Sequence, residues 1–525
     1  MAKLSSPDVS KSPSRGPDSN TATTSRLPTD VHVLVVGGGF AGIGLTIRLH
    51  QAGIRDFLIA ERSADIGGTW RDNDYPGCTC DIPSTLYSFS FAPNPAWTWS
   101  FASRDEILSY LHECVRRWQL ADRISLNTEV LSAKWDDDAR RWQVETSRGP
   151  VTATFLVAAT GPFDQPAVPA LPGLDEFTGT AFHSARWEHG HDLTARRVAV
   201  IGTGASSVQI VPAVAELAKS VQVYQRTPAW VMPKKTRPAG ALRRGLFRAV
   251  PATQRMLRAF QYWTRELPAL AVGGNRVLLA MLEGQGRAHL RAQVPDPELR
   301  RRLTPDFRIF CKRVLLSDDF YPALTRPHVE LVDNPIARVT ADGIVTADGT
   351  SRQADTIIFA TGFTVTDPPI THRLYGRGGG SLAETWRAQG RAAYLGTCVS
   401  GFPNLFLFTG PHAGTSHTSL LVMIEAQAGY ITDALRTAVA GAVEVIEVRP
   451  RVQHRFMAAA GDAVGRTVSV TGGCTSYYLD ADGHNTTLWP GASWRFRRRA
   501  RRFDAESYHL VRQGTEPRFV EMERK

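Results

Sequence analysis

The chain has 525 residues, which is enough for two or three domains, and its hydrophobic content of 43% is that of a globular protein. Its net charge of +11 comes mostly from arginine, but no zinc-finger spacing or RNA-binding signature accompanies it, so we expect a solvated basic surface and no nucleic-acid partner. The sequence has neither a run of about 18 apolar residues nor the basic-then-apolar order of a secretory signal, so we expect a cytoplasmic protein with no integral membrane segment.

The cysteine spacing predicts reduced thiols. The six cysteines form no C-x-x-C pair and lack the density of a secreted disulfide scaffold. Cys78 and Cys80 form a C-x-C pair inside a segment that is typical of a tight loop. We therefore do not expect a redox-active dithiol.

The first 30 residues are rich in Ser, Pro, Thr and Asp, and predict a disordered extension over residues 1–30. The pattern then changes to a buried strand over 31–36, a glycine-rich turn, a helix over 43–52 and a second strand over 57–61. This order is typical of a dinucleotide-binding βαβ unit. Its candidate cofactor-binding residues are Gly37, Gly39, Phe40, Ala41, Gly42 and Glu61.

The same order of elements returns later in the chain. A strand over 197–201 leads into a second glycine-rich turn, a helix that continues to about residue 218 and a strand over 221–226. The candidate cofactor-binding residues here are Gly202, Gly204, Ala205, Ser206, Ser207, Gln209, Arg226 and Thr227. Ser207 replaces the third glycine, which we expect to loosen the packing of helix on strand slightly.

The two units end their second strands in residues of opposite charge. Glu61 stands where an acid reaches the ribose hydroxyls, and Arg226 stands at the equivalent position of the second unit. An acid would repel a 2′-phosphate, whereas a guanidinium can bind one. The first site therefore suits FAD and the second suits NADPH, with Thr227 and Lys312 as further phosphate contacts.

Strand signals disappear after residue 237. Apolar residues recur at helical spacing among arginines, among them Leu242, Leu246, Met256, Leu257, Phe260 and Trp263, and predict a helical insertion over 238–305. Strand-like runs return at 329–332 and 356–360, and a helix is expected near 419–435. We predict an α/β fold with two Rossmann-like domains: an FAD-binding domain over 31–165 and 364–525, and an NADPH-binding domain over 166–237 and 306–363.

A spaced motif lies just before the second unit. Phe177, Gly179, His183 and Trp187 form F-x-G-x-x-x-H-x-x-x-W. Together with the segments 67–72, 75–82, 86–91 and 310–321, this motif resembles the fingerprint of the class B flavin monooxygenases known as type I Baeyer–Villiger monooxygenases, over residues 31–503. Glu188 departs from the Pro or Asp that commonly follows the tryptophan in that family.

The resemblance implies a reaction. FAD is reduced by NADPH and adds O₂ to give a C4a-peroxyflavin, which inserts one oxygen atom next to a ketone carbonyl to give an ester or lactone. The family places Arg313 as the catalytic residue and Asp81 as the carboxylate that positions it. A guanidinium remains charged at working pH, so it can stabilise a peroxide anion and the oxyanion of the adduct.

The resemblance also assigns further residues to the site. Those expected to line FAD are Thr69, Trp70, Asp72, Asp81, Tyr87, Val130 and Leu420, and those expected to contact substrate are Gly414, Ser416 and His417. The fingerprint is expected in the linker between the domains, where it would couple their movement. No metal is expected.

Three alternative functions stay open. A flavin monooxygenase that oxidises sulfur or nitrogen has the same two nucleotide sites. A pyridine-nucleotide disulfide reductase shares them too, but it needs a redox cysteine pair near the flavin. The third alternative is a non-catalytic sensor that binds FAD and NADPH.

Overall fold

The computed structural model describes residues 27–480 and 482–514. The predicted disordered extension therefore lies mostly outside the described residues. Its last four residues are an exception, because Leu27 is buried in the core and the Thr29 carbonyl accepts a 2.8 Å hydrogen bond from the Thr152 N–H. The expectation of disorder is wrong for residues 27–30.

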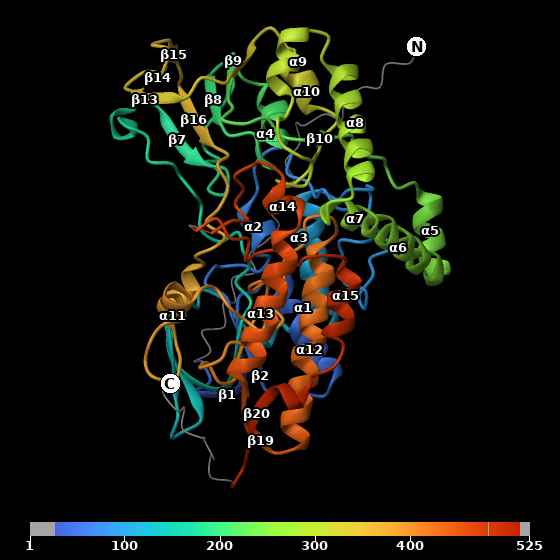
Figure 1. Ribbon diagram of the computed structural model, residues 1–525, viewed down its shortest axis with the longest axis vertical. Coiled ribbons are helices and arrows are strands. Elements are labelled where there is room, and N and C mark those ends of the chain that lie inside the picture. The colour runs from blue at the N-terminus through green and yellow to red at the C-terminus, as the bar shows by residue number, and fades with distance from the viewer. Residues whose placement is uncertain (1–26, 481, 515–525) are drawn as a thin grey trace, which may run out of the picture.

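The first sheet forms the centre of the lower half of the molecule in Figure 1. The strand order is β17-β4-β5-β6-β1-β2-β3, with β18 also paired to β6. The β6, β1, β2, β3 and β18 pairings are parallel, and the β4–β5–β6 meander is antiparallel. The strands are β1 (Asp30–Val36), β2 (Phe57–Ala60), β3 (Ile124–Ser125), β4 (Val130–Asp136), β5 (Arg141–Thr146), β6 (Gly149–Ala158), β17 (Leu374–Tyr375) and β18 (Leu405–Leu407).

The second sheet lies in the upper half and is parallel throughout, in the order β12-β9-β8-β16-β7. Its strands are β7 (Thr180–His183), β8 (Arg197–Ile201), β9 (Ser220–Tyr224), β12 (Val329–Val332) and β16 (Thr356–Phe359). All five carry mostly buried, apolar side chains, as expected for a parallel sheet covered on both faces. The two sheets thus form two doubly wound units on one chain.

Each sheet contains the strand–turn–helix that the sequence predicts. Helix α1 (Phe40–Gln51) follows β1, and α4 (Ser207–Val214) follows β8. The turns start at Gly37 and Gly202, whose φ angles of +110° and +114° favour glycine. Both glycines also lie close to the neighbouring crossover, because a Cβ on Gly37 would be 2.7 Å from the Ala159 oxygen and one on Gly202 would be 2.5 Å from the Ala360 oxygen.

Helices from both ends of the chain cover the first sheet. The largest core cluster contains residues of β1, α1, β2, α3 (Arg104–Arg117) and α12 (Leu420–Ala440), and α12 packs along α1. The chain after residue 364 therefore folds back onto the first unit. Helix α11 (Leu382–Gln389) packs on the other face of the sheet, and α14 (Val468–Thr471) packs against α7 (Pro268–Val272) of the segment 238–305. The remaining helices are α2 (Thr69–Asp72), α13 (Pro450–Gly465) and α15 (Ser493–Arg499).

The segment 238–305 is helical, as its pattern predicts. Its helices are α5 (Ala241–Ala249), α6 (Pro251–Glu266), α7 (Pro268–Val272), α8 (Arg276–Gln293) and α9 (Pro297–Leu303). Helices α5 and α6 project from the side of the molecule in Figure 1. The other elements are α10 (Phe320–Leu324) and the short strands β10 (Val231–Met232), β11 (Leu315–Leu316), β13 (Ile336–Thr340), β14 (Gly343–Thr346), β15 (Ser351–Gln353), β19 (Val443–Val448) and β20 (Tyr508–Arg512).

Over residues 27–480 and 482–514, no helix combines the length and the apolar character that a bilayer crossing requires.

Candidate active site

A deep cavity opens where the first turn meets α1. It holds about 1250 Å³ of space between protein atoms, the open mouth included. The residues predicted for the first cofactor that line it are Gly37, Gly39, Phe40, Ala41, Glu61, Thr69, Trp70, Asp72, Tyr87, Val130 and Leu420. The sequence motifs, although spread over 384 residues of chain from Gly37 to Leu420, thus converge on one cavity.

Gly42 does not line the cavity. It instead allows the start of α1 to pack against the Gly37 turn. A Cβ at this position would lie 2.0 Å from the Gly37 carbonyl oxygen. Only glycine allows the first turn of α1 to approach the Gly37 turn so closely. The residue therefore shapes the turn without touching what the turn holds.

The N-terminus of α1 is open toward the cavity. Gly39 precedes the helix, no side chain caps it, and the first turn of α1 carries no acid. The unpaired N–H groups and the positive end of the helix dipole therefore face the cavity, which is the arrangement that binds a pyrophosphate.

Glu61 is buried at the end of β2 and is already hydrogen-bonded. One carboxylate oxygen accepts the Gly38 N–H at 2.7 Å, and the other pairs with Arg71 at 2.9 Å and accepts the Ser63 N–H at 3.0 Å. A carboxylate has about four acceptor positions, so Glu61 can still accept from ribose hydroxyls. Arg71, which the sequence reasoning missed, also pairs with Asp72 at 2.8 Å and fixes both acids at the cavity wall.

Two aromatic side chains, Trp70 and Tyr87, line the cavity. Trp70 donates its indole N–H to the Tyr87 hydroxyl at 3.0 Å, and the rings meet edge to face at 5.4 Å. Burial raises the pKa of Tyr87, so the phenol stays protonated. The pair gives the cavity a rigid wall with no charge.

Two cationic side chains, Arg226 and Lys312, lie near the second turn, beyond the end of β9. The Lys312 ammonium donates to the Thr227 hydroxyl at 2.7 Å, and the Thr227 carbonyl accepts from Thr203 at 3.0 Å. Burial and the charge of Arg226 both lower the pKa of Lys312, so the two cations lie close enough to repel each other. An anion bound between them would relieve that repulsion.

Gln209, in α4, connects the second unit to the first. Its side chain accepts the Thr79 N–H at 3.2 Å and donates to the Thr79 carbonyl at 2.9 Å. It also accepts from the Tyr75 hydroxyl at 3.3 Å. We predicted Gln209 as a cofactor contact; the structure shows it holding the loop that carries Asp81.

Arg313 and Asp81 meet between the two units. The guanidinium forms a fork on the carboxylate, with Nε–Oδ2, Nη2–Oδ1 and Nη2–Oδ2 distances of 3.0, 2.8 and 2.7 Å. The side chains are 30% and 20% exposed, so the pair lies deep but open to a ligand. The charge of Asp81 raises the pKa of Arg313 well above its ordinary value, which keeps it a cation.

Two further cations lie near the same carboxylate, and the sequence reasoning missed both. Lys234 donates to the Thr79 hydroxyl at 2.5 Å, and burial lowers its pKa while Cys80 and Asp81 oppose that shift. Burial likewise lowers the pKa of Arg265, on α6, and Asp81 opposes it. Asp81 thus pairs with Arg313 and lies near enough to Lys234 and Arg265 for its charge to act on their pKa values.

The prediction of reduced thiols is wrong for two of the six cysteines. Cys311 and Cys474 form a disulfide across 163 residues of chain, and Cys78, Cys80, Cys114 and Cys398 are free. No spacing motif signals a link between cysteines so far apart. The disulfide joins the segment that carries Arg313 to the loop of Tyr477 and Tyr478, whose hydroxyls influence the pKa of Arg313.

The predicted substrate residues separate into two groups. The Gly414 N–H donates to the Thr487 carbonyl at 3.0 Å, so this residue braces the loop after Cys474. The His417 imidazole is 3% exposed and lies 3.7 Å from the Glu266 carboxylate, which also accepts the Ser493 N–H at 2.9 Å. Neither these two nor Ser416 lines the cavity, so a role in substrate contact stays a prediction.

The fingerprint residues lie in the second unit, away from Arg313. We expected them in a linker, but residues 180–183 form β7, the edge strand beside β16. A Cβ on Gly179 would be 2.5 Å from the Asp355 oxygen and the Phe177 ring, so the strand needs glycine there. His183 meets the Phe363 ring edge to face at 5.6 Å, beside the crossover at residues 361–363, and Trp187 packs on Phe182 at 5.0 Å.

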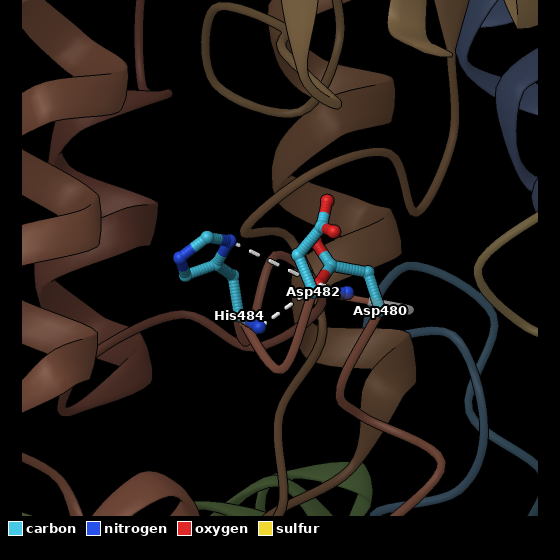
Figure 2. A group of neighbouring side chains, drawn as sticks. All are labelled: Asp480, Asp482 and His484. Carbon is cyan, nitrogen blue, oxygen red and sulfur yellow. Dashed lines mark hydrogen bonds and ion pairs between the residues drawn. The ribbon is translucent and has the colours of Figure 1, made fainter.

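Asp480, Asp482 and His484 cluster on the loop after Cys474 (Figure 2). Asp480 accepts the backbone N–H groups of Asp482 at 3.1 Å and His484 at 2.8 Å. The dashed lines in Figure 2 show Asp480 capping its own turn and its 4.0 Å ion pair with the His484 imidazole, and the side chains of Asp482 and His484 are exposed. The hydrogen bonds of this turn therefore account for the proximity of the three residues.

Comparison with known proteins places this geometry among flavoproteins. Residues 34–244 match the family model described as pyridine nucleotide-disulphide oxidoreductase. A protein of Streptomyces coelicolor named Baeyer-Villiger monooxygenase is 46% identical, over 92% of this chain and 93% of its own, and one of Pseudomonas aeruginosa with the same name is 42% identical, over 94% of each. The crystal structure of OTEMO complexed with FAD and NADP has a TM-score of 0.82 at 28% identity, covering 92% of this chain and 99% of that one.

Proposed function

Because this chain belongs to the Baeyer–Villiger monooxygenase family, we propose that it inserts one oxygen atom of O₂ next to a ketone carbonyl, using FAD in the cavity of the first unit and NADPH at the second turn. The observation that carries the proposal is the fork between Arg313 and Asp81, whose charges act on Tyr87 in the wall of that cavity. It supplies a fixed cation where an oxygen anion has to be stabilised.

The residues present fit both cofactors. The uncapped start of α1 suits a pyrophosphate, and Glu61 keeps free acceptor positions for ribose hydroxyls. Arg226 and Lys312 repel each other until an anion lies between them, which suits a 2′-phosphate and disfavours NADH. When bound, FAD supplies the redox chemistry: it takes a hydride from NADPH and delivers an oxygen atom from O₂ to the ketone.

The chain's own contribution is electrostatic. Arg313 stays protonated and is aimed by two oxygens of Asp81, so it can stabilise negative charge without reorganising. Lys234 and Arg265 add to the positive potential around the same point. The aromatic side chains of Trp70 and Tyr87 exclude water from the part of the cavity that they line.

The disulfide-reductase alternative lacks a suitable thiol in the described residues. Burial raises the pKa of Cys78 to about 12 and raises that of Cys80 further, so neither is a thiolate at neutral pH. The disulfide partner Cys311 is buried in an apolar cluster with Phe307 and Ile309. Neither Cys311 nor Cys474 lines the cavity.

The test compares the holoenzyme with Arg313→Ala and Arg313→Lys on a panel of cyclic, linear, aryl and terpenoid ketones, with a thioether as control. We expect Arg313→Ala to keep anaerobic flavin reduction by NADPH and to lose ester formation by roughly 1000-fold or more, since it removes the charge that stabilises the oxyanion. Arg313→Lys keeps the charge without the fork and should fall between the two. Unchanged ester yield from Arg313→Ala would contradict the mechanism, and wild-type turnover of the thioether alone would favour heteroatom oxidation.

A cytoplasmic location and a small-molecule ketone with O₂ as the partners complete the proposal. The Cys311–Cys474 disulfide bears on the location, because such bonds are rare in reducing compartments. Quantifying free thiols in protein trapped by alkylation inside the producing cells tests whether the bond forms there. Four free thiols are expected if it does, and six if it does not.

A further inference from the structure

Helix α6 has its apolar side facing solvent. Met256, Phe260 and Trp263 are 71%, 66% and 57% exposed, and Leu267 and Leu270, which follow in and after the next turn, are both 60% exposed. These five residues recur every three or four positions, so they form one stripe along α6 and α7. We call them the apolar stripe.

The opposite side of α6 is buried, and it carries several polar residues beside Tyr262, which packs in the largest core cluster. Gln254 donates to the Asn94 carbonyl at 2.6 Å, and Arg258 donates to the carbonyls of Thr85, Leu86 and Ser88 at 2.8 to 3.0 Å. Glu266 accepts from Ser493 at the end of the same side. Rotating α6 to bury the apolar stripe would leave these polar groups unpaired, so the helix is held with the stripe outward.

Neighbouring helices add further exposed apolar residues. Leu242 and Leu246 on α5 are 92% and 49% exposed, and Val277 and Met281 on α8 are 82% and 61% exposed. Helices α5 and α6 project from the body of the molecule, so this surface is free to approach a partner (Figure 1). Exposed apolar surface of this extent marks an interaction site.

The charge around the apolar stripe has one sign. Between residues 238 and 282 the only acid is Glu266, which is buried and bonded. Arg258 bonds to buried carbonyls and Arg265 lies near Asp81, so the positive charge of this surface comes from the other arginines of the segment, Arg243, Arg244, Arg248, Arg255 and Arg276. Helix α15 starts beside Glu266 and adds exposed arginines, of which Arg497 lies 5.2 Å from the centre of the Tyr262 ring of α6.

An exposed apolar stripe surrounded by arginines favours one kind of partner. A second copy of the chain would place arginines against arginines, which like-charge repulsion disfavours. An anionic bilayer has negative headgroups over an apolar interior, and Trp, Phe and Leu backed by Arg are typical of helices that lie in its interface. We propose that the helical insertion docks this protein on anionic lipid membranes, with the apolar stripe at the boundary of headgroups and acyl chains.

The test is sedimentation of the FAD-loaded full chain with vesicles of phosphatidylcholine, with and without phosphatidylglycerol. The variant Met256→Ser/Phe260→Ser/Trp263→Ser removes the centre of the apolar stripe. The matched control Leu131→Ser/Leu217→Ser/Val439→Ser removes three apolar residues that are 49%, 52% and 59% exposed elsewhere. Bound FAD and NADPH oxidation report that each variant is folded.

We expect the wild type to pellet with the anionic vesicles, and high salt to weaken the binding. The stripe variant should partition roughly 100-fold more weakly, while the control variant matches the wild type. Quenching of Trp fluorescence by lipids brominated near the headgroup should shrink in Trp263→Phe, which reports depth directly.

Other outcomes would overturn the proposal. Absence of wild-type binding to the anionic vesicles would do so. Full binding of the stripe variant would also do so, because it would show that the protein adsorbs through its arginines alone. A lipid-free dimer in analytical ultracentrifugation that dissociates in the stripe variant would identify a protein interface in place of a membrane one.

Discussion

The two nucleotide turns share the same strand–turn–helix backbone, but the side chains around them differ in charge and in exposure. In the first, Glu61 is buried and held by the Gly38 N–H and Arg71, in a cavity with aromatic walls. In the second, Arg226 is exposed, and it and Lys312 repel each other beside Thr227. A cavity whose acid is already held by hydrogen bonds suits a tightly bound cofactor. An exposed pair of cations suits a cofactor that binds and dissociates in each turnover.

The comparison extends to packing. At equivalent positions the first turn has Gly42 and the second has Ser207. A Cβ on Gly42 would overlap the Gly37 oxygen at 2.0 Å, whereas Ser207 is fully buried and fits. The first turn of α1 therefore lies against the Gly37 turn at a distance that only glycine allows, whereas α4 accommodates a side chain at the equivalent position.

Gly42→Ala is expected to have the largest effect on this comparison. The added methyl group must displace the Gly37 carbonyl, so we expect a loss of about 3 kcal/mol in the free energy of unfolding and release of FAD. Urea denaturation followed by far-UV circular dichroism, with flavin fluorescence for cofactor release, measures both.

The matched variant at the second turn is Ser207→Gly. It should cost about 1 kcal/mol or less, because it adds no atoms and mainly increases backbone freedom in the first turn of α4. Equal losses for the two variants would contradict the difference in packing between the turns.

Arg226→Ala tests the charge difference. We expect KM for NADPH to rise about 10- to 100-fold, since a charge-assisted contact to the 2′-phosphate is lost, with little change in KM for NADH. Steady-state NADPH and NADH oxidation gives both values. Arg338→Ala, an exposed arginine in β13 of the same unit, is the control, and an unchanged cofactor preference in Arg226→Ala would show that the phosphate lies elsewhere.

The smallest expected effect is on pH dependence. Burial and Arg226 lower the pKa of Lys312, so its ammonium loses its proton at a lower pH than an ordinary lysine does. As the pH rises through that lowered pKa, the preference for NADPH over NADH should fall a few-fold. In Lys312→Met the preference should be lower and flat over the same range, and a wild-type slope retained there would assign the titration to another group.

The strands and the turns could be predicted because each depends on neighbours close in sequence. Val31–Val36 is a run of strand formers, and Gly37 and Gly202 need positive φ, so local pattern identifies them. The Arg313–Asp81 pair spans 232 residues and came from family resemblance alone. No local rule would have found it.

What sequence reasoning missed depends on tertiary packing. The Cys311–Cys474 link and the approach of Lys234 and Arg265 to Asp81 arise only when distant segments fold together. Helix α6 shows a second reason. The spacing of Met256, Phe260 and Trp263 predicts a helix correctly, but such spacing usually marks a core-facing side, and here these three side chains face solvent.

Because of the Cys311–Cys474 bond, the redox conditions of purification decide which covalent form of the protein is studied. Protein purified with a strong reductant and protein purified in air differ in whether the Arg313 segment is tied to the Tyr477 loop. We expect the two preparations to differ in thermal inactivation half-life and in ketone range, because only the oxidised one holds that wall of the site covalently. A substrate profile for this enzyme is therefore complete only when its thiol count is given with it.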